Sequence, residues 1–183
     1  DKSEHKEKIA AENNQETFGN LSSLLKCFEV AKKDQSDLIY FVEDDYLHYE
    51  HSLVDMLNTY ERVSSQHKDE IIVCPSDYPF NYMNNEKTNI LIGSQQHWRT
   101  ITKMLCTFMI SKKMFQKHID NFEKTCEKRH EPFEKYLNKI LESEIGISPI
   151  KSLAIHMTNV NSSYGLSPFI DIKKLWEENK IGQ

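Results

Sequence analysis

The sequence predicts an α/β domain in which a mainly parallel sheet is flanked by helices as a three-layer sandwich. Apolar runs without polar alternation, which are typical of strands buried on both faces, recur as "DLIYFVED", "EIIVCPS" and "SPIKSLAIHM". Segments with apolar residues at helical spacing lie between these runs, and such alternation favours a parallel sheet. No internal repeat or low-complexity linker divides the chain, so we expect one domain over residues 1–183.

The first half of the chain alternates helix and strand after a charged lead-in over residues 1–16. Asn20 is an N-cap residue type, and apolar side chains follow it at helical spacing. These side chains are Leu21, Leu24, Leu25 and Phe28. The first strand is expected in "DLIYFVED" and the next in "EIIVCPS", which Pro75 closes. The amphipathic helix between them is marked by Leu53, Met56, Leu57 and Tyr60.

The second half begins with a loop, "DYPFNYMNNEKTN", and continues with a short strand, "ILIGS", and a longer one, "TITKMLCTFMIS". Ser111 then predicts the N-cap of a helix. The apolar face of that helix carries Phe115, His118, Ile119 and Phe122. A further helix has Pro132 in its first turn and carries Phe133, Tyr136, Leu137, Ile140 and Leu141. The last strand is expected in "SPIKSLAIHM", and a terminal helix surrounds Leu175 and Trp176.

Composition argues against several classes of protein. The formal net charge of −5 does not suit a nucleic-acid surface, which needs a clustered basic face. No apolar run reaches the ~20 residues of a membrane span, and no signal-peptide pattern opens the chain. The four cysteines are widely spaced, which is typical of reduced structural thiols. We expect a cytoplasmic protein and, because the chain begins at Asp1 rather than Met, a segment of a longer one.

Three consecutive acids, Glu43, Asp44 and Asp45, stand where the first strand ends. In open α/β sheets, ligands bind beyond the carboxyl ends of the strands. Three carboxylates are tolerable there if a divalent cation lies among them, and hard oxygen ligands suit Mg²⁺ or Mn²⁺. Alternatively, two of the acids begin the next helix, whose dipole favours them, and the third is exposed.

These residues also carry a family resemblance. "NLSSLLKCFEVAKKDQSDLIYFVEDDYLH" resembles the central part of a family 2 glycosyltransferase with the GT-A fold, where a helix leads to a strand capped by the acidic DXD motif. "GSQQHWRT" and "SLAIHMTNVNSSYGLSPFID" are similar to a viral and bacterial subgroup with unassigned or polysaccharide-related roles. The resemblance spans Asn20 to Asp171. It implies a GT-A-like (Rossmann-like) fold and inverting transfer of a sugar from a nucleotide-diphosphate sugar, a UDP-sugar favoured, to a glycan or other hydroxyl acceptor.

The resemblance also implies a metal site for Mn²⁺ or Mg²⁺. Glu43, Asp44 and Asp45 match the acidic motif that binds the donor diphosphate, and Asp45 matches the direct metal ligand. The family often places a further ligand, a histidine, at the end of a late strand, where this chain has His156. The alternative for His156 is a hydrogen-bonded core histidine. His48 and His51 lie close to the acids, and we assign both to the start of the second helix.

An inverting transfer needs a base that takes the proton of the acceptor hydroxyl. In the resembled family, that base is an acid at the start of a helix between the motif and the late strand, which here matches Glu131. The family usually has Asp in this place, so Glu134 and Asp77 remain competitors. Glu131 is otherwise a first-turn acid that stabilises the helix N-terminus.

The stretch "QHWRT" contains further candidates for binding the sugar or acceptor. Trp98 is expected to stack on a sugar ring, while His97 and Arg99 are expected to hydrogen-bond hydroxyls or the diphosphate. Asp77 in "CPSDYP" is a candidate sugar-hydroxyl contact by similar logic. The alternative for Trp98 is a core residue at the rim of a strand.

The chain departs from the family before Asn20. Complete members carry a strand–helix–strand unit there that holds the nucleotide base, and this chain has 19 residues in that place. We therefore expect the nucleotide-binding half to be missing or to lie outside the chain. Two other functions remain open: a metal-dependent phosphoryl or nucleotidyl transferase, which would use the same acids on phosphate, and a non-catalytic domain that retains a decayed site.

Overall fold

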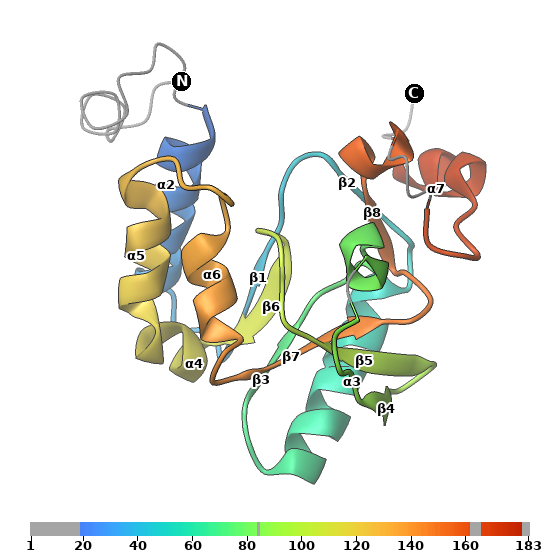
Figure 1. Cartoon of the computed structure of the whole chain (residues 1–183), viewed down its shortest axis with the longest axis horizontal. Helices are drawn as coiled ribbons and strands as arrows, with labels where there is room; N and C mark the ends of the chain where they lie inside the picture. Colours follow the sequence, from blue (N-terminus) through green and yellow to red (C-terminus); the bar gives the residue numbers. More distant parts are fainter. Residues whose placement is uncertain (1–18, 84, 162–165, 181–183) are drawn as a thin grey trace.

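The computed structural model describes residues 19–83, 85–161 and 166–180, which form an α/β fold (Figure 1). The helices are α2 (Gly19–Lys33), α3 (Ser52–His67), α4 (Lys112–Lys117), α5 (Ile119–Glu127), α6 (Lys135–Ile140) and α7 (Ile172–Asn179), with 3-10 turns η1 (Pro79–Tyr82) and η2 (Met157–Asn161). The strands are β1 (Leu38–Phe41), β2 (Tyr46–His48), β3 (Ile71–Val73), β4 (Ile90–Ile92), β5 (His97–Ile101), β6 (Phe108–Ser111), β7 (Ile145–Pro149) and β8 (Ala154–His156). The lead-in predicted over residues 1–16 lies outside the described residues.

The central sheet has six strands in the order β1-β6-β3-β7-β5-β4. β3 and β7 pair in parallel, whereas the other neighbouring pairs are antiparallel. The prediction of a mainly parallel sheet is therefore wrong. An unbroken apolar run indicates that a strand is covered on both faces, but it carries no information about the direction of that strand. Here the covered strands belong to a mixed sheet.

Three strands nevertheless point the same way. β1 and β3 are both antiparallel to β6, which lies between them, and β7 is parallel to β3. The carboxyl ends of these three strands therefore lie at the same end of the sheet, which we call its carboxyl edge. The chain continues from that edge into the acidic stretch after β1, into Asp77 after β3, and into β8 after β7.

Helices cover both faces of this sheet. On one face, α2, α5 and α6 contribute Phe28, Phe122 and Leu137 to a cluster that includes Ile72 of β3. On the other face, α3 packs against Ile71 and Val73 of the same strand. Successive side chains of a strand point to opposite faces, so β3 is buried by both layers. Figure 1 shows the two sets of helices on either side of the sheet.

The buried face of α3 differs from the predicted one. Leu53 and Leu57 are exposed, whereas Asp55, Met56 and Thr59 are buried. The reason is a set of polar contacts with the turn between β4 and β5: the backbone N–H of residue 95 donates to Asp55 Oδ1 at 3.2 Å, and that of residue 94 donates to Thr59 Oγ1 at 2.9 Å. Hydrophobic periodicity cannot detect a helix face that packs through hydrogen bonds.

Several predicted elements are divided or shifted. The long strand expected over residues 100–111 is divided into the end of β5 and the whole of β6. The expected last strand is divided into the end of β7 and β8, and these two strands belong to different sheets. Ser111 caps α4 as predicted, since its Oγ accepts from the N–H of Met114 at 3.1 Å, but the helix is interrupted at His118 before α5. α6 begins at Lys135 rather than at Pro132. α2 begins at Gly19, so Asn20 lies inside the helix rather than at its N-cap.

Among the residues that the structure describes, no helix is both long and apolar enough to cross a membrane.

Candidate active site

Asp45 and His156 lie 111 positions apart in the chain and contact each other in the fold. β2, which the sequence did not predict, pairs antiparallel with β8 in a separate two-stranded sheet, and its first residue, Tyr46, stands opposite His156. This register places Asp45, which precedes Tyr46, beside His156, so that His156 Nε2 lies 2.7 Å from Asp45 Oδ2. The predicted proximity of these two residues is confirmed, while their role as metal ligands stays a prediction.

The imidazole of His156 is held on three sides. The Tyr46 ring stacks on it with centroids 4.8 Å apart and an interplanar angle of 10°. Thr158 Oγ1 lies 3.0 Å from Nδ1 and 3.4 Å from Nε2, so it stands beside both ring nitrogens. A histidine whose second ring nitrogen has its own partner keeps a fixed orientation, which is typical of histidines that bind metal.

Glu43 is held by Thr107, a fully buried residue just before β6. The backbone N–H of Glu43 donates to Thr107 Oγ1 at 2.9 Å, and the same hydroxyl lies 3.4 Å from Glu43 Oε2. Burial raises the pKa of Glu43 to about 7, and the charges of Asp45, Glu134 and Asp44 add to the rise. The acids therefore repel one another at neutral pH, and a cation among them would relieve that repulsion.

Glu134 belongs to this cluster although it lies far along the chain. It is half-buried and occupies the position before α6. Burial raises the pKa of its carboxyl, while the nearby charge of His156 lowers it and that of Glu131 raises it. Glu131 itself is exposed. Of Glu131 and Glu134, two of the three acids considered for the base, Glu134 is the one that shares the electrostatic environment of Glu43 and His156.

The acids face an open cleft of about 400 Å³. Its walls come from α2, from the end of β1, from the segment before β6 and from the segment before α6. The lining residues are Ser23, Leu24, Cys27, Val42, Glu43, Asp44, Asp45, Cys106 and Phe133. No lysine or arginine is among these described residues, so no side chain of the lining neutralises the acids. The cleft thus has the size of a ligand site, and its described lining is acidic.

Asp45 and His156 offer an oxygen donor and a nitrogen donor to a magnesium-like or manganese-like ion. Such ions bind through one or two protein side chains and retain waters and substrate phosphates, with bonds of about 2.1 Å. Two neighbouring ligands of an octahedral ion at that bond length are about 3 Å apart, whereas Asp45 Oδ2 and His156 Nε2 are 2.7 Å apart, the distance of a hydrogen-bonded pair. In the described part of the chain, no set of three or more His, Cys, Asp or Glu side chains is arranged to hold a metal. Asp45 and His156 are thus a pair of candidate ligands.

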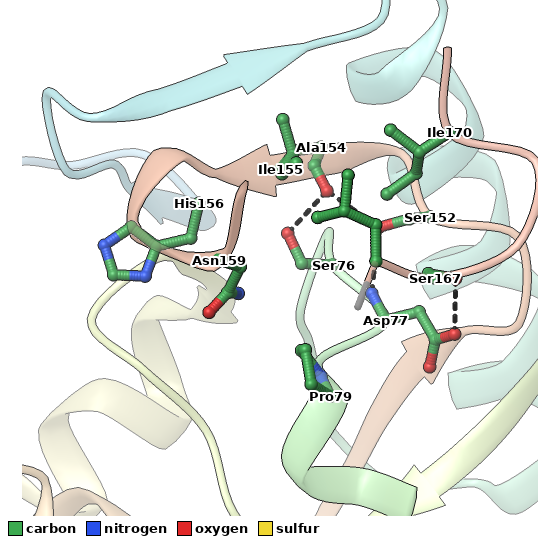
Figure 2. A pocket seen from close by; sticks show the side chains of 11 residues that line it. Ser76, Asp77, Pro79, Ser152, Ala154, Ile155, His156, Asn159, Ser167 and Ile170 are labelled. Carbon is green, nitrogen blue, oxygen red and sulfur yellow. Dashed lines mark hydrogen bonds between the residues drawn. The ribbon is translucent and has the colours of Figure 1, made fainter. Parts of the chain in front are cut away.

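Asp77, a predicted sugar contact and competing base, is occupied by the protein itself. Its side chain accepts from Arg99 Nη2 at 2.8 Å and from Ser167 Oγ at 2.6 Å, and Tyr82 donates to it as well. The residue is 3% exposed. Figure 2 shows Asp77 bonded to Ser152 and Ser167, with the His156 ring pointing away from it. Asp77 is therefore a structural residue in this fold.

Four residues of "QHWRT", from His97 to Thr100, lie on β5, and two of them are buried. Trp98 is 0% exposed and packs in the core beneath α3, so no face of its ring is open to a sugar. Gly93 makes room for it, because a Cβ at Gly93 would lie 2.2 Å from the indole. Arg99 is 9% exposed and lies over the Tyr82 ring. The sugar-binding roles predicted for Trp98 and Arg99 are thus not available in this structure, whereas His97 is exposed.

His48 and His51 lie outside the site. His48 Nε2 lies 2.5 Å from the Tyr40 hydroxyl, and burial lowers the pKa of His48. His51 is exposed at the start of α3. Leaving both out of the metal ligands is consistent with these contacts.

Two residues that support the site, Thr107 and Tyr46, were not predicted from the sequence. Tyr46 follows the acids in "EDDYLH", and the apolar-polar alternation of "YLH" is a weak strand signal. Thr107 makes a contact 64 positions away, for which no local pattern exists. In comparisons with known proteins, no family model and no curated protein sequence matches the chain.

Proposed function

We propose that this chain is a glycosyltransferase domain of GT-A-like type, which moves a sugar from a nucleotide-diphosphate sugar to a hydroxyl acceptor with inversion and with a divalent metal. The observation that supports this most is the contact of Asp45 with His156 beside Glu43 at the carboxyl edge of the sheet. Asp45, in the turn between β1 and β2, and His156, at the end of β8, lie 2.7 Å apart. Asp45 lines the acidic cleft, and the described lining of that cleft contains no lysine or arginine.

In this proposal, Asp45 and His156 hold the ion, and Tyr46 and Thr158 fix the imidazole so that Nε2 faces it. The bound ion, Mn²⁺ or Mg²⁺, supplies the positive charge that stabilises a departing diphosphate. Glu43 and Asp44 increase the negative potential that attracts the cation. A histidine ligand favours Mn²⁺ over Mg²⁺, since Mg²⁺ prefers oxygen ligands.

The proton of the acceptor hydroxyl needs a carboxylate close to the cluster. Glu134 is our choice, because it shares the electrostatic environment of the acids and because burial raises the pKa of its carboxyl toward the range of a general base. Glu131, which the resemblance had indicated, is exposed and influences the site through its charge on Glu134. The acceptor would be a glycan or another hydroxyl compound, and a UDP-sugar remains the favoured donor.

The test is coupling between metal and nucleotide. Calorimetric titration with Mn²⁺ and a panel of nucleotide sugars should show that each ligand tightens the other, and Asp45→Asn should remove that coupling. Asp120→Asn, which changes an exposed acid on α5, is the matched control. Titrations in which Mn²⁺ and nucleotide bind independently of each other would contradict the proposal and support a non-catalytic domain.

Product analysis then separates the reaction types. Release of a free nucleoside diphosphate in the presence of acceptor indicates glycosyl transfer. Release of pyrophosphate or inorganic phosphate would instead indicate a phosphoryl or nucleotidyl transferase. The products are needed to distinguish these reactions, because all of them would use the same acids.

A further inference from the structure

A second cavity joins the acidic cleft. It is a groove of about 600 Å³ between α2 and the outer edge of β1. Its lining residues are Ser23, Lys26, Cys27, Val30, Ala31, Asp34, Ser36, Leu38, Ile39, Tyr40, Phe41 and Val42. Ser23, Cys27 and Val42 line the acidic cleft as well. The two cavities therefore adjoin, and together they form one trough that runs from the acids along α2.

The two walls of the groove differ in chemistry. On the α2 wall, Ser23, Cys27, Val30 and Asp34 recur every three or four residues, so one face of the helix is turned toward the groove. Val30 is 59% exposed there. On the opposite wall, β1 pairs with β6 alone among the described strands, so its outer edge presents backbone N–H and C=O groups.

These walls suit a flat ring with a polar edge. Apolar side chains cover the faces of such a ring, and a strand edge offers alternating donors and acceptors to its rim. None of the acids Glu43, Asp44 and Asp45 lines the groove. The charged residues in the described lining of the groove are Lys26 and Asp34, one of each sign, so the groove has no net negative charge like that of the acidic cleft. It therefore suits the uncharged end of a ligand whose anionic part is held at the metal site.

We propose that the nucleoside of the donor lies in this trough, past Ser23, Cys27 and Val42, with its diphosphate at the Asp45 end. This inference rests on the proposed function, because it takes the diphosphate position from the metal site. It places nucleoside binding on α2 and β1 of this chain itself. A polypeptide strand added to the β1 edge would occupy the same groove, but it would not use the connection between the groove and the acidic cleft.

The first experiment compares ligands with and without a nucleoside. In Mn²⁺, inorganic pyrophosphate is titrated beside UDP, GDP, ADP and CDP. At least one nucleoside diphosphate should bind ten times more tightly than pyrophosphate or better. Val30 lines the groove but not the acidic cleft. Val30→Trp should therefore lower the affinity for that nucleotide to the affinity for pyrophosphate, and it should leave the affinity for pyrophosphate unchanged. Lys33→Trp is the matched control, because Lys33 is exposed on α2 and lines neither cavity.

The second experiment needs no variant. Cys27 is exposed whereas Cys74, Cys106 and Cys126 are buried, so N-ethylmaleimide should react first at Cys27. The nucleotide with Mn²⁺ should slow this reaction at least fivefold, and pyrophosphate with Mn²⁺ should not.

The outcomes separate the two proposals. Nucleotides that bind no better than pyrophosphate, or that leave Cys27 fully reactive, would overturn the trough assignment while the metal site stands. If Mn²⁺ changes the affinity for neither pyrophosphate nor the nucleotides, the proposed function is overturned, and with it the basis of this inference. Protection of Cys27 that rises with protein concentration in the absence of nucleotide would show a second copy at the β1 edge and would also overturn it.

Discussion

Thr107 makes two contacts with Glu43 across 64 positions of the chain: its hydroxyl accepts from the Glu43 N–H at 2.9 Å and lies 3.4 Å from Glu43 Oε2. Thr107 is fully buried, whereas Glu43 reaches the cleft. The residue thus connects the core to the acidic cluster and fixes where the first of the three acids points.

Thr107→Val keeps the shape of the side chain and removes the hydroxyl. The Glu43 N–H then loses its partner, which should cost about 1–3 kcal/mol in the free energy of unfolding measured with urea. Because Glu43 is no longer held, the affinity for Mn²⁺ should fall as well. Thr107→Ser retains the hydroxyl and is the control; it should restore the affinity even if the lost methyl group lowers stability. Equal Mn²⁺ affinity in both variants would limit Thr107 to a structural role.

The pKa of Glu43 predicts how Mn²⁺ affinity depends on pH. In the folded chain this pKa is raised from 4.5 to about 7. Below pH 7, Glu43 therefore holds a proton, which a cation in the cluster must displace. For one displaced proton, affinity should rise about tenfold between pH 6 and pH 8 and change little above that range. Calorimetry in buffers of different ionisation enthalpy measures the proton released.

Glu43→Gln removes the titrating group and is the control for this prediction. Its Mn²⁺ affinity should depend less on pH over the same interval. The same raised pKa affects the stability of the free protein. The contribution of Glu43 to the free energy of unfolding is fully present below pH 4.5 and is lost as the pH rises through 7. A wild-type affinity that is flat between pH 6 and pH 8 would contradict the assignment of Glu43 to the metal cluster.

Glu134→Gln should separate binding from transfer. The variant keeps the size of the side chain and removes its ability to take a proton, so donor binding should persist while the transfer rate falls by at least a hundredfold. Glu131→Gln changes the exposed neighbour and should reduce transfer only a few-fold. Single-turnover measurements with saturating donor report the transfer rate directly. Loss of transfer in Glu131→Gln with full activity in Glu134→Gln would return the base to Glu131.

Lys112 closes the C-terminal end of α2. Its Nζ donates to the carbonyl oxygens of Lys32 at 2.9 Å and Asp34 at 2.7 Å, and to that of Ala31 as well. Carbonyls at a helix end have no partner within the helix, and a cation there also interacts favourably with the helix dipole. Lys112→Met should therefore lower the free energy of unfolding by about 1–3 kcal/mol. Lys113→Met removes a side chain that is 81% exposed and should change it by less than about 0.5 kcal/mol.

The sequence predicted the parts of the site that depend on local patterns. β1 and β3 are where unbroken apolar runs occur, and the acids follow β1 directly. The proximity of Asp45 and His156 was implied by a resemblance and is present in the fold. Strand direction was not predictable, because an apolar run looks the same in both directions. The burial of Trp98 depends on the space left by Gly93, five positions earlier, and on packing against the distant helix α3, and a local apolar pattern reports neither contact.

The ion pair of Asp77 with Arg99 supplies a last prediction, about stability rather than catalysis. Both residues are buried, and Asp77 is the charged partner of the Arg99 guanidinium, which otherwise stacks on Tyr82. Removing one member of a buried pair leaves the other charge uncompensated, which typically costs about 3–5 kcal/mol. Asp77→Ala should therefore lower the free energy of unfolding by about that amount.

Replacing both partners tests whether the loss of stability in Asp77→Ala arises from the uncompensated charge of Arg99. The double variant Asp77→Leu with Arg99→Met should recover much of the stability lost in Asp77→Ala, because no buried charge then lacks a partner. The Mn²⁺ affinity should stay close to the wild-type value in the double variant, since His156 points away from Asp77 (Figure 2). If the Asp77→Ala chain instead folds with unchanged stability and binds sugar more weakly, Asp77 belongs to the ligand site. Its carboxylate would then contact a sugar hydroxyl rather than stabilise the fold through Arg99.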